Sequence, residues 1–163
     1  MSTATVLEQA PFRFTASLVS PKPGEIRLHA RIENTSKTTV HLFDDEEMPY
    51  RLLREEDGAL LVLHGVNPPD PMRSYYAIKI PITRPLAPGQ ALSLDVPIVP
   101  ITLRDHYQAD PEPEQPKTPF VVHFQVGWGA KPILASETHR VAIDYVLEWQ
   151  TLVTGPTLRW PAP

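Results

Sequence analysis

Apolar and polar residues alternate in short segments along most of the chain, which is the pattern of half-buried β-strands. In Glu25–Glu33, every second residue from Ile26 to Ile32 is apolar and the residues between them are polar or charged. Phe12–Leu18 repeats this pattern. Further strands are predicted at Thr38–Phe43, Tyr50–Glu55, Ala59–His64, Tyr75–Ile80, Ala91–Val96 and Phe120–Val126. About eight short strands at intervals of roughly ten residues are typical of a β-sandwich or barrel.

Turn residues between these segments indicate how the strands connect. Asp57-Gly58 predicts a hairpin between Tyr50–Glu55 and Ala59–His64. A second hairpin is predicted between Glu25–Glu33 and Thr38–Phe43. In it Ile32 lies opposite Val40, because this register keeps the apolar side chains on one face. Near the C-terminus, Arg140–Glu148 fits either a last strand or a short helix.

Proline content supports the same fold class. The chain contains 20 prolines, 7 glycines and no cysteine, and proline is excluded from helix interiors and central strands because its ring fixes φ and removes the N–H donor. We therefore predict an all-β protein, an antiparallel immunoglobulin-like β-sandwich that forms a single domain over residues 1–163. Its prolines concentrate in a long proline-rich loop at 97–119, and an apolar C-terminal tail follows at 150–163.

Composition removes several classes of function. Without cysteine there is no disulfide, thiol nucleophile or cysteine-ligated metal site. A net charge of −4 gives no basic footprint for nucleic acid or for an anionic membrane surface. The opening sequence MSTATVLEQA lacks the pattern of a signal peptide, and no apolar run approaches the roughly 20 residues of a membrane helix. We expect a cytoplasmic protein with no nucleic-acid or membrane partner.

Parts of the sequence resemble known bacterial proteins. Ile26–Phe43 resembles the strand, Asn-Thr-Ser turn and strand that open many bacterial immunoglobulin-like modules. With the Asp57-Gly58 hairpin and the turn Leu86–Gln90, the order is similar to that of the BsuPI-type intracellular proteinase inhibitor domain, which implies a β-sandwich and protease inhibition. The chain departs from that family at Asp44–Glu47. Phe124–Gly129 also resembles a segment of an uncharacterised group of bacterial proteins of similar size.

Few residues suggest catalysis or metal binding. The carboxylates of Asp44–Glu47 suit calcium, magnesium or a basic partner, but consecutive residues of an extended chain point in opposite directions, which favours a solvated turn. Asp105-His106 is an acid–base pair only in sequence, and no nucleophile elbow is present. No metal-binding spacing connects the histidines, which are His29, His41, His64, His106, His123 and His139. We therefore expect a non-enzymatic protein with no cofactor, metal or catalytic residues.

Apolar and aromatic side chains supply the remaining candidates. The tail offers Leu152, Val153, Leu158 and Trp160, which pack either on their own domain or on a partner protein or second copy of the chain. Trp128, Tyr75 and Tyr76 are candidates for stacking on a small molecule or sugar. The first hypothesis is a protein-binding or assembly module of unknown partner. A small-molecule or sugar-binding domain and an intracellular protease inhibitor are the alternatives.

Overall fold

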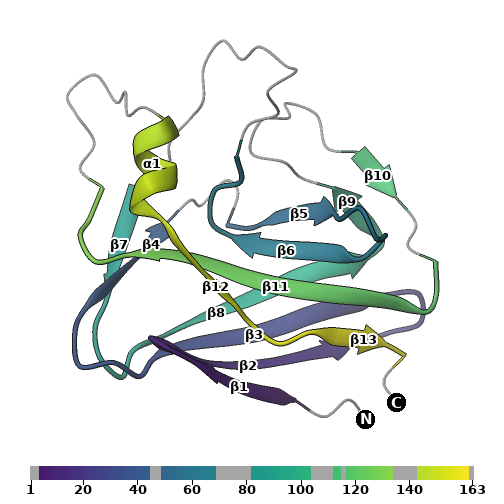
Figure 1. Ribbon diagram of the computed structural model, residues 1–163. Helices are drawn as coiled ribbons and strands as arrows, with labels where there is room; N and C mark the ends of the chain where they lie inside the picture. The colour runs from purple at the N-terminus through teal and green to yellow at the C-terminus, as the bar shows by residue number, and fades with distance from the viewer. Residues whose placement is uncertain are drawn as a thin grey trace.

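The computed structural model describes residues 4–44, 49–68, 82–103, 112–114, 117–133 and 143–161. Strands dominate this part of the chain, so the all-β prediction is confirmed (Figure 1). A single short helix, α1 (Ile143–Trp149), occurs within the described ranges. No helix there has the length and hydrophobicity needed to cross a bilayer. The strand predicted at Tyr75–Ile80 lies outside the described residues.

One sheet contains four antiparallel strands in the order β1-β2-β3-β8. They are β1 (Thr5–Gln9), β2 (Phe12–Val19), β3 (Ile26–Asn34) and β8 (Ala91–Val99). In β3 the apolar residues from Ile26 to Ile32 are buried while Arg27, His29 and Arg31 face outward, as the alternation predicts. The edge strand β1 has no buried residue.

The second sheet has seven strands, with β5-β6-β11-β4-β7 as its main path. These strands are β4 (Val40–Asp44), β5 (Arg51–Arg54), β6 (Leu60–His64), β7 (Ile82–Leu86) and β11 (Phe120–Gly129). The C-terminal strands β12 (Thr151–Thr154) and β13 (Leu158–Trp160) pair antiparallel with β11. β6 and β11 are parallel, so this sheet is mixed.

β11 is the strand around which the second sheet is organised. Val122 pairs with Leu60 of β6 and with Leu158 of β13, which places these two strands on opposite edges of β11. Further along, Trp128 pairs with Leu42 of β4 and Thr151 of β12. The chain's C-terminus therefore closes one edge of its own central strand (Figure 1).

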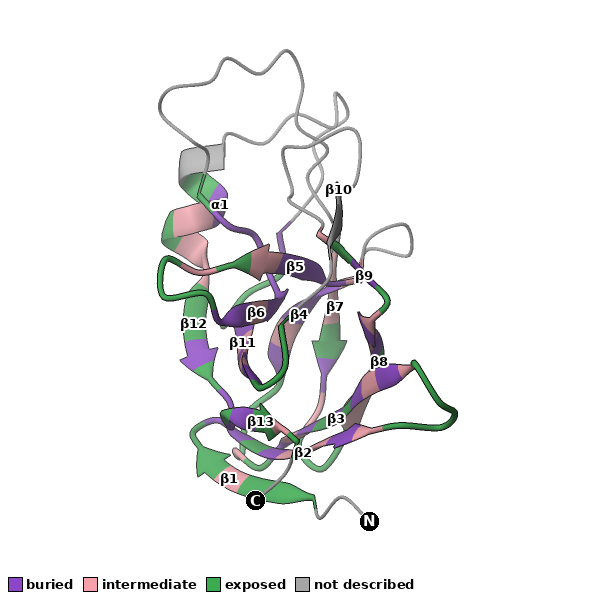
Figure 2. Cartoon of the chain, turned by 90° about the vertical axis from the view of Figure 1, so that its right-hand side faces the viewer, coloured by how far each residue is buried: buried purple, intermediate pink, exposed green. Residues whose placement is uncertain are grey.

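Buried residues from both sheets, coloured purple in Figure 2, form the main hydrophobic core. Phe14 of β2 meets Phe124 of β11 edge to face, with 5.8 Å between ring centroids, and both side chains are fully buried. A smaller cluster beneath α1 joins Phe43, Val66, Ile133 and Val146. Nearly all of the buried hydrophobic residues belong to one of these two clusters.

The predicted hairpin between Glu25–Glu33 and Thr38–Phe43 is wrong. β3 pairs with β2 and β8, whereas β4 pairs with β7 and β11, so the chain crosses from one sheet to the other after Asn34. The alternation had identified the buried face of each strand correctly. Two strands that bury their faces in one core need not be neighbours in one sheet.

The predicted loop at 97–119 is not confirmed. β8 continues through Pro97 to Val99, and two short strands follow, β9 (Ile101–Leu103) and β10 (Glu112–Glu114), which pair with each other. Proline is tolerated in β8 because that strand lies at the edge of its sheet. At the other uncertain segment, Arg140–Glu148, the described residues form the start and middle of α1, so the helix alternative applies there.

Candidate functional site

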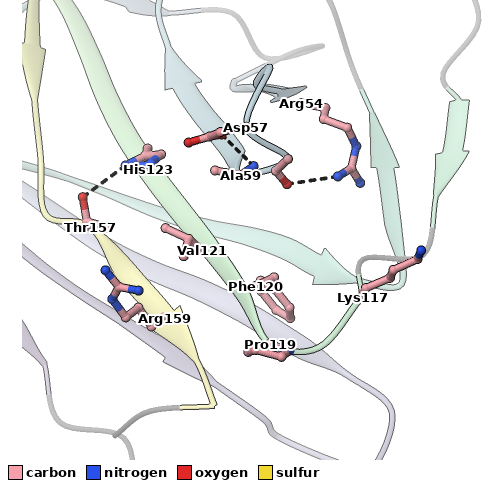
Figure 3. Close-up of a pocket in the computed structure, with 11 residues that line it drawn as sticks. Arg54, Asp57, Ala59, Lys117, Pro119, Phe120, Val121, His123, Thr157 and Arg159 are labelled. Atoms are coloured by element: carbon pink, nitrogen blue, oxygen red, sulfur yellow. Dashed lines mark hydrogen bonds between the residues drawn. The ribbon is translucent and has the colours of Figure 1, made fainter.

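A pocket of about 650 Å³ opens beside the turn between β5 and β6 (Figure 3). Three parts of the chain line it: the hairpin turn, the start of β11, and the segment around β13. Its lining residues with polar or charged side chains are Arg54, Asp57, Lys117, His123, Thr157 and Arg159.

The hairpin turn is held by its own backbone. Glu55 N–H donates to the carbonyl of Ala59 at 2.8 Å, and Gly58 N–H donates to the carbonyl of Glu55 at 2.9 Å. Gly58 has a φ of +88°, which residues with a side chain rarely adopt. An Asp57 carboxylate oxygen accepts from Ala59 N–H at 2.9 Å, which fixes the direction of that side chain. The predicted Asp57-Gly58 hairpin is confirmed.

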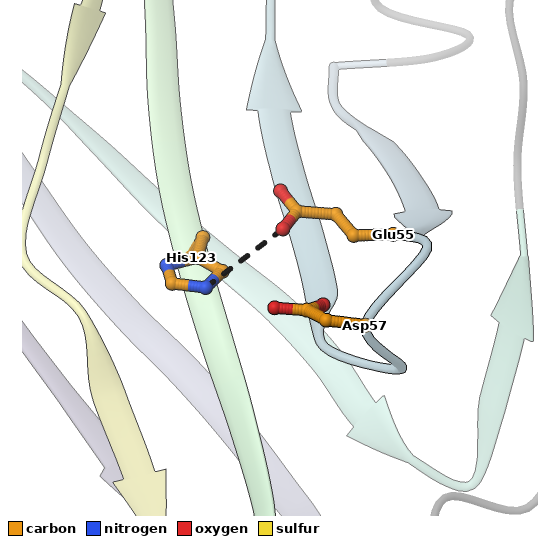
Figure 4. Close-up of side chains that lie close together, drawn as sticks. All are labelled: Glu55, Asp57 and His123. Carbon is orange, nitrogen blue, oxygen red and sulfur yellow. Dashed lines mark ion pairs between the residues drawn. The ribbon is translucent and has the colours of Figure 1, made fainter.

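His123 projects toward the turn from the neighbouring strand β11. Val122 and Phe124 on either side of it point into the core, so the alternation of β11 turns the imidazole outward. Its Nδ1 lies 3.1 Å from the Thr157 hydroxyl, and its Nε2 lies 3.8 Å from a Glu55 carboxylate oxygen (Figure 4). One histidine thus connects the hairpin turn with the C-terminal segment.

Three basic side chains surround the same pocket. Arg54 donates to the carbonyl of Gly58 at 3.0 Å. Lys117 and Arg159 have no hydrogen bond or ion pair within the described part of the chain. Figure 3 shows them on opposite sides of the pocket, with Phe120 and Val121 between them.

Arginines on the outer face of the other sheet behave differently. Arg13 pairs with Glu8 at 2.6 Å, Arg27 pairs with Asp95 at 2.7 Å, and Arg31 pairs with Glu33 at 2.8 Å. On that face these three arginines each pair with a carboxylate. The pocket differs because two of its cations, Lys117 and Arg159, pair with no carboxylate of the described residues.

The tail residues predicted to bind a partner divide into two groups. Val153 and Leu158 are buried in the main core, where they pack on the chain's own sheets. Trp160 is partly buried against the same core, and Leu152 is 49 % exposed. Partner binding through the tail stays a prediction that concerns Leu152 and the exposed part of Trp160.

Trp128, the candidate for ligand stacking, packs against the core. Its ring meets Phe12 edge to face, with 6.3 Å between the centroids. The glycines beside it serve close packing, because Gln150 lies against Gly127 and the Trp149 ring lies against Gly129 where a Cβ would have to fit. Tyr75 and Tyr76 are outside the described residues.

The other sequence candidates do not converge on the pocket. His29 and Asp95, which lie 3.4 Å apart, are both on the four-stranded sheet, away from the pocket. His64 is buried at the end of β6. Asp44 ends β4, whereas the rest of the acidic run and Asp105-His106 lie outside the described residues. Sequence reasoning missed Lys117, Thr157 and Arg159. Lys117 approaches the hairpin because β11, which follows it, pairs with β6, and Thr157 and Arg159 do so because the tail pairs with β11.

Comparison with protein-family models, with curated proteins and with solved structures finds no match to this chain.

Proposed function

We propose that this protein is a binding module with an immunoglobulin-like β-sandwich fold, and that the pocket beside the β5–β6 hairpin takes a small organic anion. Two sheets that share one core support the sandwich. The observation that carries the ligand class is a pair of cations at one pocket, Lys117 and Arg159, that have no partner among the residues the structure describes.

The pocket has the two kinds of surface that an organic anion requires. A carboxylate or phosphate group can form charge-assisted hydrogen bonds with the guanidinium of Arg159, which offers several N–H donors, and with the ammonium of Lys117. The apolar body of the ligand would lie on Val121 and Pro119, which line the pocket between these cations. A volume of about 650 Å³ lies within the usual range for small-molecule sites.

The positive charges at the pocket, rather than the net charge of the protein, support an anionic ligand. The protein as a whole carries a net charge of −4, so long-range attraction does not favour an anion. Recognition would then depend on direct contacts with Lys117 and Arg159 at the pocket, and both of these side chains are exposed. Because dissolved ions screen exposed charges, binding should weaken as salt is added.

The proposal is tested by screening aromatic and aliphatic carboxylates and phosphate monoesters by ligand-observed NMR, followed by calorimetric titration of the hits. Arg159→Gln removes the charge-assisted hydrogen bonds and should weaken binding about tenfold or more. Lys117→Gln should weaken it by a smaller factor, because a single ammonium gives fewer fixed contacts.

Arg31→Gln is the matched control, because Arg31 is an exposed arginine on the other sheet that already pairs with Glu33. This variant should bind the same anions with unchanged affinity. The proposal fails if neutral analogues bind as well as the acids do, or if Arg31→Gln and Arg159→Gln reduce binding equally.

A further inference from the structure

We infer that Glu55, Asp57 and His123 (Figure 4) form a site for a divalent transition-metal ion beside this pocket, which Asp57 and His123 also line. The three residues come from two separate elements: the hairpin turn supplies the carboxylates and β11 supplies the imidazole. Their potential ligand atoms all lie within 4.8 Å of one another.

This spacing is close to what a metal ion requires. Zinc binds imidazole nitrogen and carboxylate oxygen at about 2.0–2.2 Å, so ligand atoms at tetrahedral angles around it lie about 3.5 Å apart. The distance from His123 Nε2 to the Glu55 carboxylate is 3.8 Å. Small side-chain rotations, without a change in the backbone, would bring the three ligand atoms to metal-binding distances.

Thr157, which lies outside the cluster, orients the imidazole. Its hydroxyl is 3.1 Å from His123 Nδ1. When Nδ1 carries the proton and donates to Thr157, the lone pair of Nε2 faces the carboxylates. Metal-bound histidines are usually oriented in this way, by a hydrogen bond from the ring nitrogen that does not bind the metal. In this tautomer Nε2 and the two carboxylates would present lone pairs to a common point, where one cation could bind all three.

The carboxylates are available to an ion. Within the described residues, neither Glu55 nor Asp57 has a lysine or arginine partner, and the one ion-pair partner of Glu55 is His123. The nearby Arg54 guanidinium donates to the Gly58 carbonyl. One Asp57 oxygen accepts from Ala59 N–H, which leaves the second oxygen for a metal.

The donor set indicates the class of metal. One imidazole and two carboxylates suit zinc, manganese, cobalt or nickel, whereas magnesium and calcium prefer oxygen ligands alone. Three protein ligands leave coordination positions open toward the pocket. If the pocket binds an organic anion as proposed above, the acid group bound by Arg159 would also be able to coordinate the metal. Only this contact between anion and metal rests on the proposed function.

The test begins with protein stripped of metal by a chelator and titrated calorimetrically with Zn²⁺, Co²⁺ and Mg²⁺. We expect one equivalent of Zn²⁺ or Co²⁺ to bind much more tightly than Mg²⁺, with Co²⁺ giving visible absorption bands. Glu55→Gln and His123→Gln should each weaken Zn²⁺ binding at least about tenfold, and Thr157→Val should weaken it about tenfold through the loss of the orienting hydrogen bond.

His29→Gln is the control, because His29 also lies near a carboxylate, Asp95, but belongs to no group of three potential metal ligands within the described residues. Zn²⁺ affinity that is unchanged in Glu55→Gln, or lowered equally in His29→Gln, would overturn the inference, as would equal affinity for Mg²⁺. Circular dichroism establishes that each variant is folded. Anion binding by the metal-free protein is measured separately with Arg159→Gln, so either proposal can fail while the other stands.

Discussion

Two connections of this molecule contain similar turns but differ in how far their polar side chains are hydrogen-bonded or charge-paired within the protein. One is the junction of Asn34 with the turn that contains Gly89, and the other is the hairpin turn that contains Gly58. Both glycines adopt positive φ, +83° and +88° respectively. The difference lies in whether the chain itself supplies partners for the side chains around each turn.

At the Asn34 junction the polar groups are paired. The fully buried Asn34 amide donates to the carbonyls of Thr38 and Leu86, at 2.9 and 2.8 Å, and its oxygen accepts from the backbone N–H and hydroxyl of Ser36. Its backbone N–H donates to Gln90, and its carbonyl accepts from Gly89. Asn34 thus connects the segment that crosses from β3 to β4 with the turn that precedes β8.

At the Gly58 hairpin the charged groups converge without complete pairing. Lys117 and Arg159 have no partner within the described ranges, and two carboxylates face one imidazole. Buried polar groups that are fully paired specify structure, whereas unpaired groups at a pocket are suited to a ligand. We therefore propose that the first region stabilises the fold and that the second binds a ligand.

The largest effect is expected for Asn34→Ala. This substitution removes the side-chain hydrogen bonds and leaves the carbonyls of Thr38 and Leu86 without that donor in a buried region. The free energy of unfolding should fall by about 2–4 kcal/mol. Urea denaturation measures it, and Ser36→Ala, which loses only a partly exposed hydroxyl, should cost about 1 kcal/mol or less. A loss for Asn34→Ala no larger than that for Ser36→Ala would contradict a structural role for this junction.

The sequence could indicate where turns lie, but not which strands they bring together. Asp57-Gly58 was sufficient to predict its hairpin because a two-strand unit with a tight turn is local. The turn after Asn34 looked equally local, yet Asn34 bonds to Leu86, far along the chain. Strand faces follow from the alternation of neighbouring residues, whereas strand partners depend on contacts that sequence spacing does not reveal.

For the candidate site, too, the sequence could place single residues on turns or strands but could not show which of them lie close together. Asp57 could be placed at a turn from the sequence, and His123 could be placed on a strand. Their approach depends on the parallel pairing of β6 with β11, and the contribution of Thr157 depends on the tail. β1 was also missed, because a strand in which no residue is buried leaves no alternation for the sequence to display.

A smaller effect, which depends on pH, is expected from His64, the buried histidine at the end of β6. Burial lowers the pKa of His64 below its usual value near 6.5, and the positive charges of Arg51 and Arg84 lower it further, against the opposing hydrogen bond to the Pro49 carbonyl. The unfolded chain therefore takes up a proton near pH 6.5 while folded His64 stays neutral. Stability should be unaffected by His64 above that pH and should decrease as the pH falls below it.

Denaturant unfolding between pH 5 and 8 measures this dependence. The slope due to His64 cannot exceed about 1.4 kcal/mol per pH unit, since one proton is involved. Subtracting the profile of His64→Gln from that of the natural chain isolates it, because the other histidines are common to both proteins. A difference that is flat, or that grows in the opposite direction, would mean that the folded protein does not lower this pKa.

The smallest effect on stability is expected at the pocket cations. Because Lys117 and Arg159 have no partners within the described residues, Lys117→Gln and Arg159→Gln should each change the free energy of unfolding by no more than about 0.5 kcal/mol. Thermal denaturation without added anions measures the change. If Arg159→Gln destabilised the protein as much as Asn34→Ala does, Arg159 would belong to the structural group. If Arg159→Gln weakens anion binding while stability is unchanged, the two turns differ as proposed. Protein groups pair with the polar side chains at the first turn, and a ligand pairs with the charged side chains at the second.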